Sequence, residues 1–168
     1  LHQQHGERCV SVKACFAMRG GLNGGTAASM FNALDDGVQA QVDDPFLLNP
    51  AGTVPVDAAS HRDPAGALRD ADFGGWLAPF VMGPINSRVV RRSAALLADS
   101  GLYAPAFRYQ EYARMGRGAA GALTATTVAV GMAAGRSALG FAPLRRVAAR
   151  FMPAPGEGPS EQVMDRGS

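Results

Sequence analysis

The sequence of 168 residues is poor in the residue types that build metal sites and activated nucleophiles. It contains two cysteines, three histidines and a single lysine. Cys9 and Cys15 lie in one extended stretch, which keeps them apart because a strand rises about 3.3 Å per residue. No C-x-x-C pair or Cys/His cluster is present, so the sequence predicts no metal site. Reduced thiols are typical of a cytoplasmic protein, and we expect that location.

The patterns of hydrolytic enzymes are also missing. His2, His5 and His61 are scattered along the chain and belong to no recognised nucleophile motif, and no G-x-S-x-G is present. We therefore expect the histidines to lie in solvent, and the sequence gives no support for hydrolase chemistry.

The chain also lacks a large excess of positive or negative charge. Sixteen lysines and arginines face fourteen acidic residues, a formal net charge of +2, so no nucleic-acid partner is expected. Aromatic residues make up 7% of the chain and hydrophobic residues 47%, which predicts a folded domain with an aliphatic, alanine-rich core. Because the chain starts with Leu1 and stops without a terminating element, we expect a fragment of a longer protein.

Alternating apolar and polar residues predict strands near 8–18 and 106–113, and an apolar run predicts a short strand at 76–82. In the first strand, Val12 and Phe16 should be buried and Lys13 should not. We also expect Trp76 in the core. Strands of this kind, with helices between them, predict an α+β fold whose mixed or antiparallel sheet carries helices packed on one face.

Helical patterns cover 26–36 and 86–99. Thr26 is the expected cap of the first helix, and Asn86 opens the second. The second helix is predicted to bury an apolar stripe and to expose its charged residues. The stripe consists of Val89, Val90, Leu96 and Leu97; the residues expected outside are Arg88, Arg91, Arg92 and Asp99.

The stretch 118–135 has no charged residue between Arg117 and Arg136. Its length admits a membrane span, but Gly, Ala and Thr dominate, which favours a buried helix. We divide the chain into a domain at 1–117, an Ala-rich helix followed by a basic amphipathic helix at 118–152, and a Pro/Gly turn region at 153–168. Four prolines within 43–66 predict irregular chain there.

The glycine cluster at 20–26 joins a predicted strand to a predicted helix. This cluster contains neither G-x-G-x-x-G nor G-K-[ST]. Free amides at the helix start, beside Asn23 and Thr26, could hold an anion or a carbonyl group, and an ordinary tight turn is the alternative. Similarly, Arg88, Arg91 and Arg92 share one helix surface that suits either salt bridges or contact with an anion or partner.

Three segments together resemble the saccharopine dehydrogenase-like oxidoreductases. They are WLAPFVMGPINSRVVRRSAALL at 76–97, FMPAPGEGPSEQ at 151–162 and GGLNGGTAASM at 20–30. The resemblance covers about residues 7–168 and is strongest to the branch of trans-acting enoyl reductases in polyketide-lipid synthesis. It corresponds to the carboxy-terminal portion of these proteins, without their Rossmann domain.

The resemblance implies a substrate-side domain of an NAD(P)-dependent oxidoreductase acting on an acyl or polyketide-derived lipid. It implies that NAD(P)H is bound by the missing amino-terminal domain, with no cofactor-binding residue in this chain, and that this chain alone is inactive. We expect substrate binding at Asn23, Thr26, Asn86 and Arg88, while the catalytic residues stay unassigned. Tyr103, Tyr109 and Tyr112 are proton-donor candidates by residue type only.

Two alternatives stay open. One is a non-catalytic domain that contacts a lipid surface or a partner through the basic amphipathic stretch, where Arg145, Arg146 and Arg150 accompany apolar side chains. Such contact would be peripheral to the membrane. The other is an amino-acid dehydrogenase domain of the saccharopine type.

Overall fold

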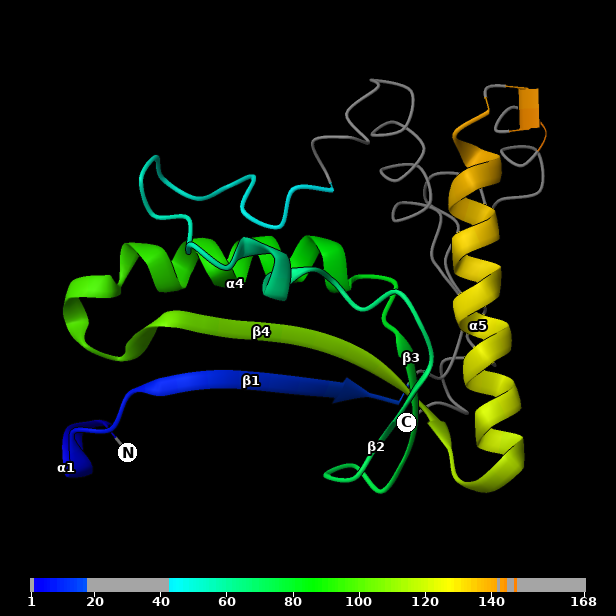
Figure 1. The fold of residues 1–168 in the computed structure, drawn as a ribbon, viewed down its shortest axis with the longest axis horizontal. Helices are drawn as coiled ribbons and strands as arrows, with labels where there is room; N and C mark the ends of the chain where they lie inside the picture. The colour runs from blue at the N-terminus through cyan, green and yellow to red at the C-terminus, as the bar shows by residue number, and fades with distance from the viewer. Residues whose placement is uncertain (1, 18–42, 142, 145–146, 148–168) are drawn as a thin grey trace, which may run out of the picture.

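A four-stranded mixed sheet organises the part of the chain that the computed structural model describes, which is residues 2–17, 43–141, 143, 144 and 147 (Figure 1). The strand order is β1-β4-β3-β2, with β1 parallel to β4 and the other neighbours antiparallel. This confirms the predicted α+β fold. The strands are β1 (Cys9–Phe16), β2 (Leu68–Asp70), β3 (Gly75–Pro79) and β4 (Tyr103–Gly116).

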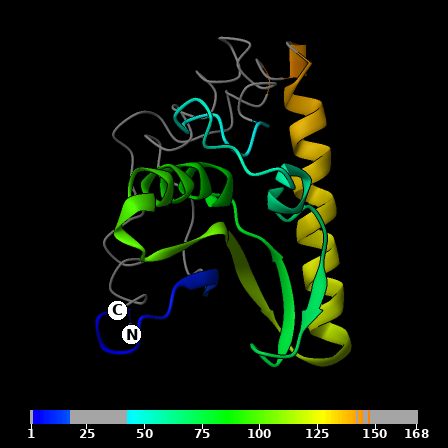
Figure 2. The same cartoon turned by 60° about the vertical axis from the view of Figure 1, so that its left-hand side comes forward.

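Two long helices accompany the sheet. Figures 1 and 2 show α4 (Gly83–Leu96) lying along β4 and α5 (Gly118–Leu139) beside β2 and β3. The remaining helical elements are short: α1 (His2–His5), η1 (Ala58–His61) and η2 (Ala98–Ser100). Apart from η1, the proline-rich stretch from residue 43 to 66 contains no helix or strand, as predicted. The core side chains include Leu77, Ala78, Phe107, Tyr112, Ala113, Ala125 and Ala129.

The expected burial of Val12 and Phe16 is wrong. These side chains are 37% and 39% exposed. The register places Val12 beside Tyr109, on the side of the sheet that α4 covers, but α4 packs over β4 and leaves the edge strand β1 open. The Phe16 ring stacks on Phe80, with 4.7 Å between ring centroids. Lys13 stays out of the core, as predicted.

The predicted orientation of α4 is wrong for most of its residues: Arg88 and Arg91 are buried, and Arg92 alone of the three arginines is exposed, as predicted. The helix begins at Gly83, three residues before Asn86, because Pro84 is well tolerated in a first turn that needs no N–H from it. Val89 and Leu96 of the predicted buried stripe are 52% and 61% exposed. The buried residues are Gly83, Ser87, Arg88, Arg91 and Ala94.

Three further expectations fail on exposure. The helix predicted at 118–135 forms as α5, but only a narrow stripe through Ala125 and Ala129 is buried. By length and composition alone, Gly118–Ala138 is apolar enough to cross a membrane. Trp76 is half-buried rather than in the core, and His61, expected in solvent, is buried.

The predicted helix at 26–36 and the glycine cluster at 20–26 lie outside the described residues, as does most of 142–168.

Candidate functional site

The buried face of α4 forms a polar seam with β4 and the chain around η1. We use "α4 seam" for Asn86, Ser87, Arg88 and Arg91 together with their acidic partners Asp63 and Glu111. Arg88 donates to Asp63 Oδ2, and Ser87 Oγ donates to Asp63 Oδ1 at 2.9 Å. A buried arginine is tolerated only where its donors find acceptors, and Asp63 supplies one that the helical periodicity does not predict.

Arg91 connects three separate segments. Its Nη2 donates to the carbonyl oxygens of His61 at 2.6 Å and Tyr109 at 3.1 Å, and its Nη1 donates to that of Pro45 at 3.1 Å. Asp63 Oδ1 lies 3.5 Å from Nη2. Burial lowers the pKa of the Arg91 guanidinium, with Asp63 opposing the shift. Because an arginine still stays protonated, a positive charge is fixed inside the fold.

The second part of the seam is a short hydrogen-bond chain. Asn86 Nδ2 donates to Glu111 Oε2 at 2.9 Å, and the Tyr109 hydroxyl donates to Glu111 Oε1 at 2.6 Å. Burial and the bond to Glu111 raise the pKa of Tyr109 to about 12. Its proton is therefore held toward Glu111 at neutral pH, which makes Tyr109 a poor proton donor.

His61 lies behind the seam as a buried neutral ring. Its ring packs edge-on against Phe46 at 5.1 Å between centroids, and its Nε2 is 3.6 Å from Asp57 Oδ1. Burial lowers the His61 pKa, with Asp57 opposing. Neither ring nitrogen has a hydrogen-bond partner within the described residues. We assign this ring to packing of the η1 segment.

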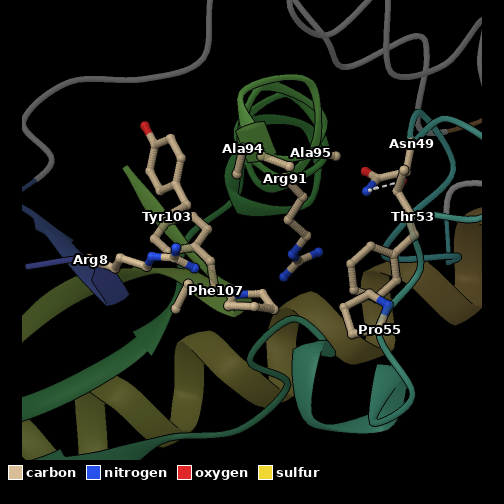
Figure 3. Close-up of a pocket in the computed structure, with 13 residues that line it drawn as sticks. Arg8, Asn49, Thr53, Pro55, Arg91, Ala94, Ala95, Tyr103 and Phe107 are labelled. Carbon is tan, nitrogen blue, oxygen red and sulfur yellow. Dashed lines mark hydrogen bonds between the residues drawn. The ribbon is translucent and has the colours of Figure 1, made fainter. Parts of the chain in front are cut away.

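A pocket of about 290 Å³ opens beside Arg91, between α4, the start of β4 and the loop after residue 45 (Figure 3). Its walls are mostly apolar, with Phe46, Phe107 and several alanines and prolines. The Tyr103 ring lies 4.7 Å from that of Phe107. Arg8 reaches in from the residues before β1, and none of the described residues that line the space is acidic.

The structure describes two of the four predicted site residues. Asn23 and Thr26 lie outside the described residues. Asn86 and Arg88 both belong to the α4 seam, where they bind different carboxylates, and neither lines the pocket. The other two tyrosines differ from Tyr109: Tyr103 lines the pocket, whereas Tyr112 is buried, donates to Gln110 Oε1 at 3.1 Å and has its pKa raised by burial.

Asp63 and Arg8 were missed as site residues, and Arg91 was considered only as part of a charged helix surface. Asp63 and Arg8 sit in irregular chain, where no periodicity predicts contacts over long sequence separations. One signal was available for the seam: Ser87, Arg91 and Ala94 recur at helical spacing and could form a face of their own. Within the described residues, no group of three or more His, Cys, Asp or Glu side chains could hold a metal ion.

A second glycine motif joins β4 to α5, and it was not among the motifs predicted from the sequence. Residues 116–121 read G-R-G-A-A-G, which matches G-x-G-x-x-G between a strand and a helix. Gly116 and Gly118 have positive φ values of 105° and 62°, and a Cβ on Gly121 would lie 2.6 Å from the Gly116 carbonyl carbon. These glycines allow α5 to approach the end of β4 closely.

This motif lacks the surroundings of a dinucleotide site. In a dinucleotide site, the helix after the glycines leads to a second strand that pairs in parallel with the strand before them. An acidic residue also follows about 20 residues after the glycines. Near Gly116, β4 pairs with β3 in antiparallel fashion, and residues 136–141 are R-S-A-L-G-F, without an acid. The described residues therefore do not fit a nicotinamide dinucleotide.

Comparison with known proteins gives one consistent result. The chain is 35% identical over 90% of its length to a protein of Mycobacterium tuberculosis provisionally named a trans-acting enoyl reductase. It is 34% identical over 96% of its length to the trans-acting enoyl reductase of Mycobacterium bovis, and 33% identical over 86% to that of Mycobacterium ulcerans. The chain spans about two-fifths of these relatives: 38%, 41% and 37% of their lengths. No protein-family model and no solved structure matches it.

Proposed function

We propose that this chain is the substrate-side part of an NAD(P)H-dependent enoyl reductase of the saccharopine dehydrogenase-like type. An enoyl reductase saturates a carbon–carbon double bond conjugated to a carbonyl, and we assign an acyl or polyketide-derived lipid as substrate. The observation that carries the proposal is the similarity to trans-acting enoyl reductases over about nine-tenths of the chain.

The arrangement of the described residues supports a binding role rather than the hydride-transfer chemistry. The cofactor does not fit the motif at 116–121, so we assign it to a nucleotide-binding domain outside this chain. The α4 seam fixes α4 on β4 and leaves a mainly apolar pocket beside it, as expected of a scaffold that orients a lipid-like substrate.

The test is an assay of the complete polypeptide that contains this chain. NADPH oxidation is followed by absorbance with trans-2-decenoyl thioester, and decanoyl thioester is the matched saturated control. We expect oxidation with the enoyl thioester only, together with a product two hydrogens heavier by mass spectrometry. Equal rates with both thioesters would contradict the proposal, and oxidation of saccharopine with NAD⁺ would support the amino-acid dehydrogenase instead.

A second function is favoured by the exposure of α5. Leu123 is 71% exposed, and most of the apolar surface of this helix faces away from the sheet. We propose that α5 contacts a lipid surface peripherally from the cytoplasmic side, aided by the basic residues near 145–150. Each arginine would contribute about 1 kcal/mol at an anionic surface.

Membrane extraction tests this contact. Cell membranes carrying the complete protein are washed with alkaline carbonate, and a second sample with high salt. Release by either treatment is expected, because Ala, Gly and Thr contribute little to insertion. Resistance to both would show that α5 spans the bilayer.

A further inference from the structure

The described residues that line the pocket beside Arg91 contribute an excess of positive charge. Of the residues that line it, two are arginines, Arg8 and Arg91, and none is acidic. Arg91 is 3% exposed, and its guanidinium meets three carbonyl oxygens and Asp63, a carboxylate that also binds Arg88. A buried cation behind a low-dielectric wall raises the potential of the space in front of it.

Two buried polar atoms in the pocket wall also lack partners within the described residues. They are Arg91 Nε, a donor, and Asn49 Oδ1, whose amide nitrogen already donates to Thr53 Oγ1 at 3.3 Å. Folded proteins rarely leave such atoms unsatisfied, and they favour a polar group at this end of the pocket.

The rest of the pocket wall is mainly apolar, which favours a ligand whose remaining part is apolar. Phe46, Phe107 and Tyr103 contribute aromatic surface, and Ala94, Ala95 and Ala98 of the α4–η2 region leave room beside them. A volume of about 290 Å³ is at the small end of ligand pockets, which run from about 300 to 1,000 Å³. The space fits a short chain or ring rather than an entire lipid.

We propose that this pocket binds the anionic head, carboxylate or phosphate, of a ligand with a short apolar body. Arg8 binds the anion directly, because it is exposed and its side chain extends into the pocket (Figure 3). Arg91 supplies the fixed charge behind the wall. This proposal concerns the same pocket that supports the substrate-side role, but it does not require enoyl reduction, which is chemistry of the complete polypeptide, so either proposal can fail alone.

The probes are hexanoate, hexyl phosphate and the neutral hexanol, titrated into the isotopically labelled 168-residue chain. Amide shifts in two-dimensional NMR spectra report both affinity and location. We expect saturable binding of one or both anions, with shifts at residues 94–98 and 103–107, and binding of hexanol at least tenfold weaker. The tighter anion identifies the head group as carboxylate or phosphate.

Arg8→Ala tests the direct contact, and Arg69→Ala, at the exposed position of β2, is the matched control. Loss of a charge-assisted contact should weaken anion binding about tenfold in Arg8→Ala and leave hexanol binding unchanged. Arg69→Ala should bind like the original chain. Equal affinity for hexanol and hexanoate, unchanged anion binding in Arg8→Ala, or no shifts at the pocket would each overturn the proposal. These binding measurements do not depend on whether the complete polypeptide proves to be an enoyl reductase.

Discussion

Arg91 holds together segments that are distant in sequence, and its loss should destabilise the fold strongly. In Arg91→Ala, the carbonyls of Pro45, His61 and Tyr109 lose a shared charged donor inside the protein. Breaking such a buried network costs about 3–5 kcal/mol. We expect urea unfolding, followed by circular dichroism, to show a loss of this size. Arg91→Lys should rescue little, because one ammonium cannot reproduce the planar fork.

The exposed Arg69→Ala serves as the control for this measurement. It should change the free energy of unfolding by no more than about 0.5 kcal/mol. A loss of under 1 kcal/mol in Arg91→Ala would contradict the role assigned to Arg91 in connecting these segments.

His61 makes stability depend on pH in the acidic range. Burial lowers its pKa in the folded chain, so between its unfolded value near 6.5 and the lower folded value the unfolded chain binds more protons. Stability is therefore fully present above pH 6.5 and is lost as the pH falls toward the folded value. We expect the free energy of unfolding to decline from pH 7 to pH 5. His61→Phe should flatten this decline, whereas the exposed His5→Gln should not.

At the scale of elements, the contact between α5 and the end of β4 depends on glycine at one position. A Cβ at Gly121 would lie 2.6 Å from the carbonyl carbon and 2.7 Å from the oxygen of Gly116, and both are backbone atoms. Gly121→Ala should therefore lower stability by about 1–3 kcal/mol through overpacking. The matched control is Gly131→Ala on the same helix, where nothing lies within 4 Å of the new Cβ.

Gly131→Ala should raise stability by about 0.4–1 kcal/mol through helix propensity and reduced unfolded-state entropy. Opposite signs for the two substitutions in one thermal-unfolding experiment are the expected result. If Gly121→Ala were also stabilising, the close approach of α5 to β4 would be wrong.

Elements were more predictable than their orientation. Strict alternation located β1 and the middle of β4, and an uncharged run located α5, because these periods depend on local sequence. Whether α4 buried its valines or its arginines depended on Asp63 and on backbone carbonyls more than 20 residues away. Burial of Phe16 depended on where α4 lay across the sheet. The helical spacing of Ser87, Arg91 and Ala94 allows a buried face but does not identify its partners, and no local pattern predicts the position of α4 over Phe16.

For the candidate site, too, individual residues were predictable but their contacts were not. Asn86 and Arg88 were singled out, and both lie in the α4 seam, but their partners Glu111 and Asp63 could not be paired with them from spacing. The pocket was not predicted, since Arg8, Asn49 and Phe107 come from three regions of the chain. Such convergence is a property of the tertiary fold.

At the scale of the whole molecule, we expect the isolated chain not to bind NADPH. Its G-x-G-x-x-G at 116–121 lacks both the parallel crossover and the acidic residue of a dinucleotide site. Titration with NADPH, followed by nicotinamide fluorescence, should give no saturable change, whereas the complete polypeptide should bind at micromolar concentration. Saturable binding by the isolated chain, abolished by a bulky residue at Gly118, would assign the cofactor to this loop instead.

The apolar face of α4 also has consequences for the whole molecule. Ile85, Val89 and Leu96 recur at i, i+4 and i+11 and are all more than half exposed. Since large exposed apolar patches favour association, we expect the isolated chain to form dimers or larger species as its concentration rises and to bind a hydrophobic dye. In the complete protein, we propose that the nucleotide-binding domain covers this face.

Val89→Gln should weaken self-association about tenfold, measured by light scattering after size exclusion, because it places a polar group within the apolar row. The control is Val56→Gln, which alters a fully exposed valine of the irregular segment far from that row in sequence. Equal effects of both substitutions would mean that association depends on total surface hydrophobicity and not on α4. If the chain stays monomeric at several hundred micromolar and binds no dye, the exposed apolar face of α4 does not drive association. The proposed contact with the nucleotide-binding domain would then have to lie on another surface of the chain.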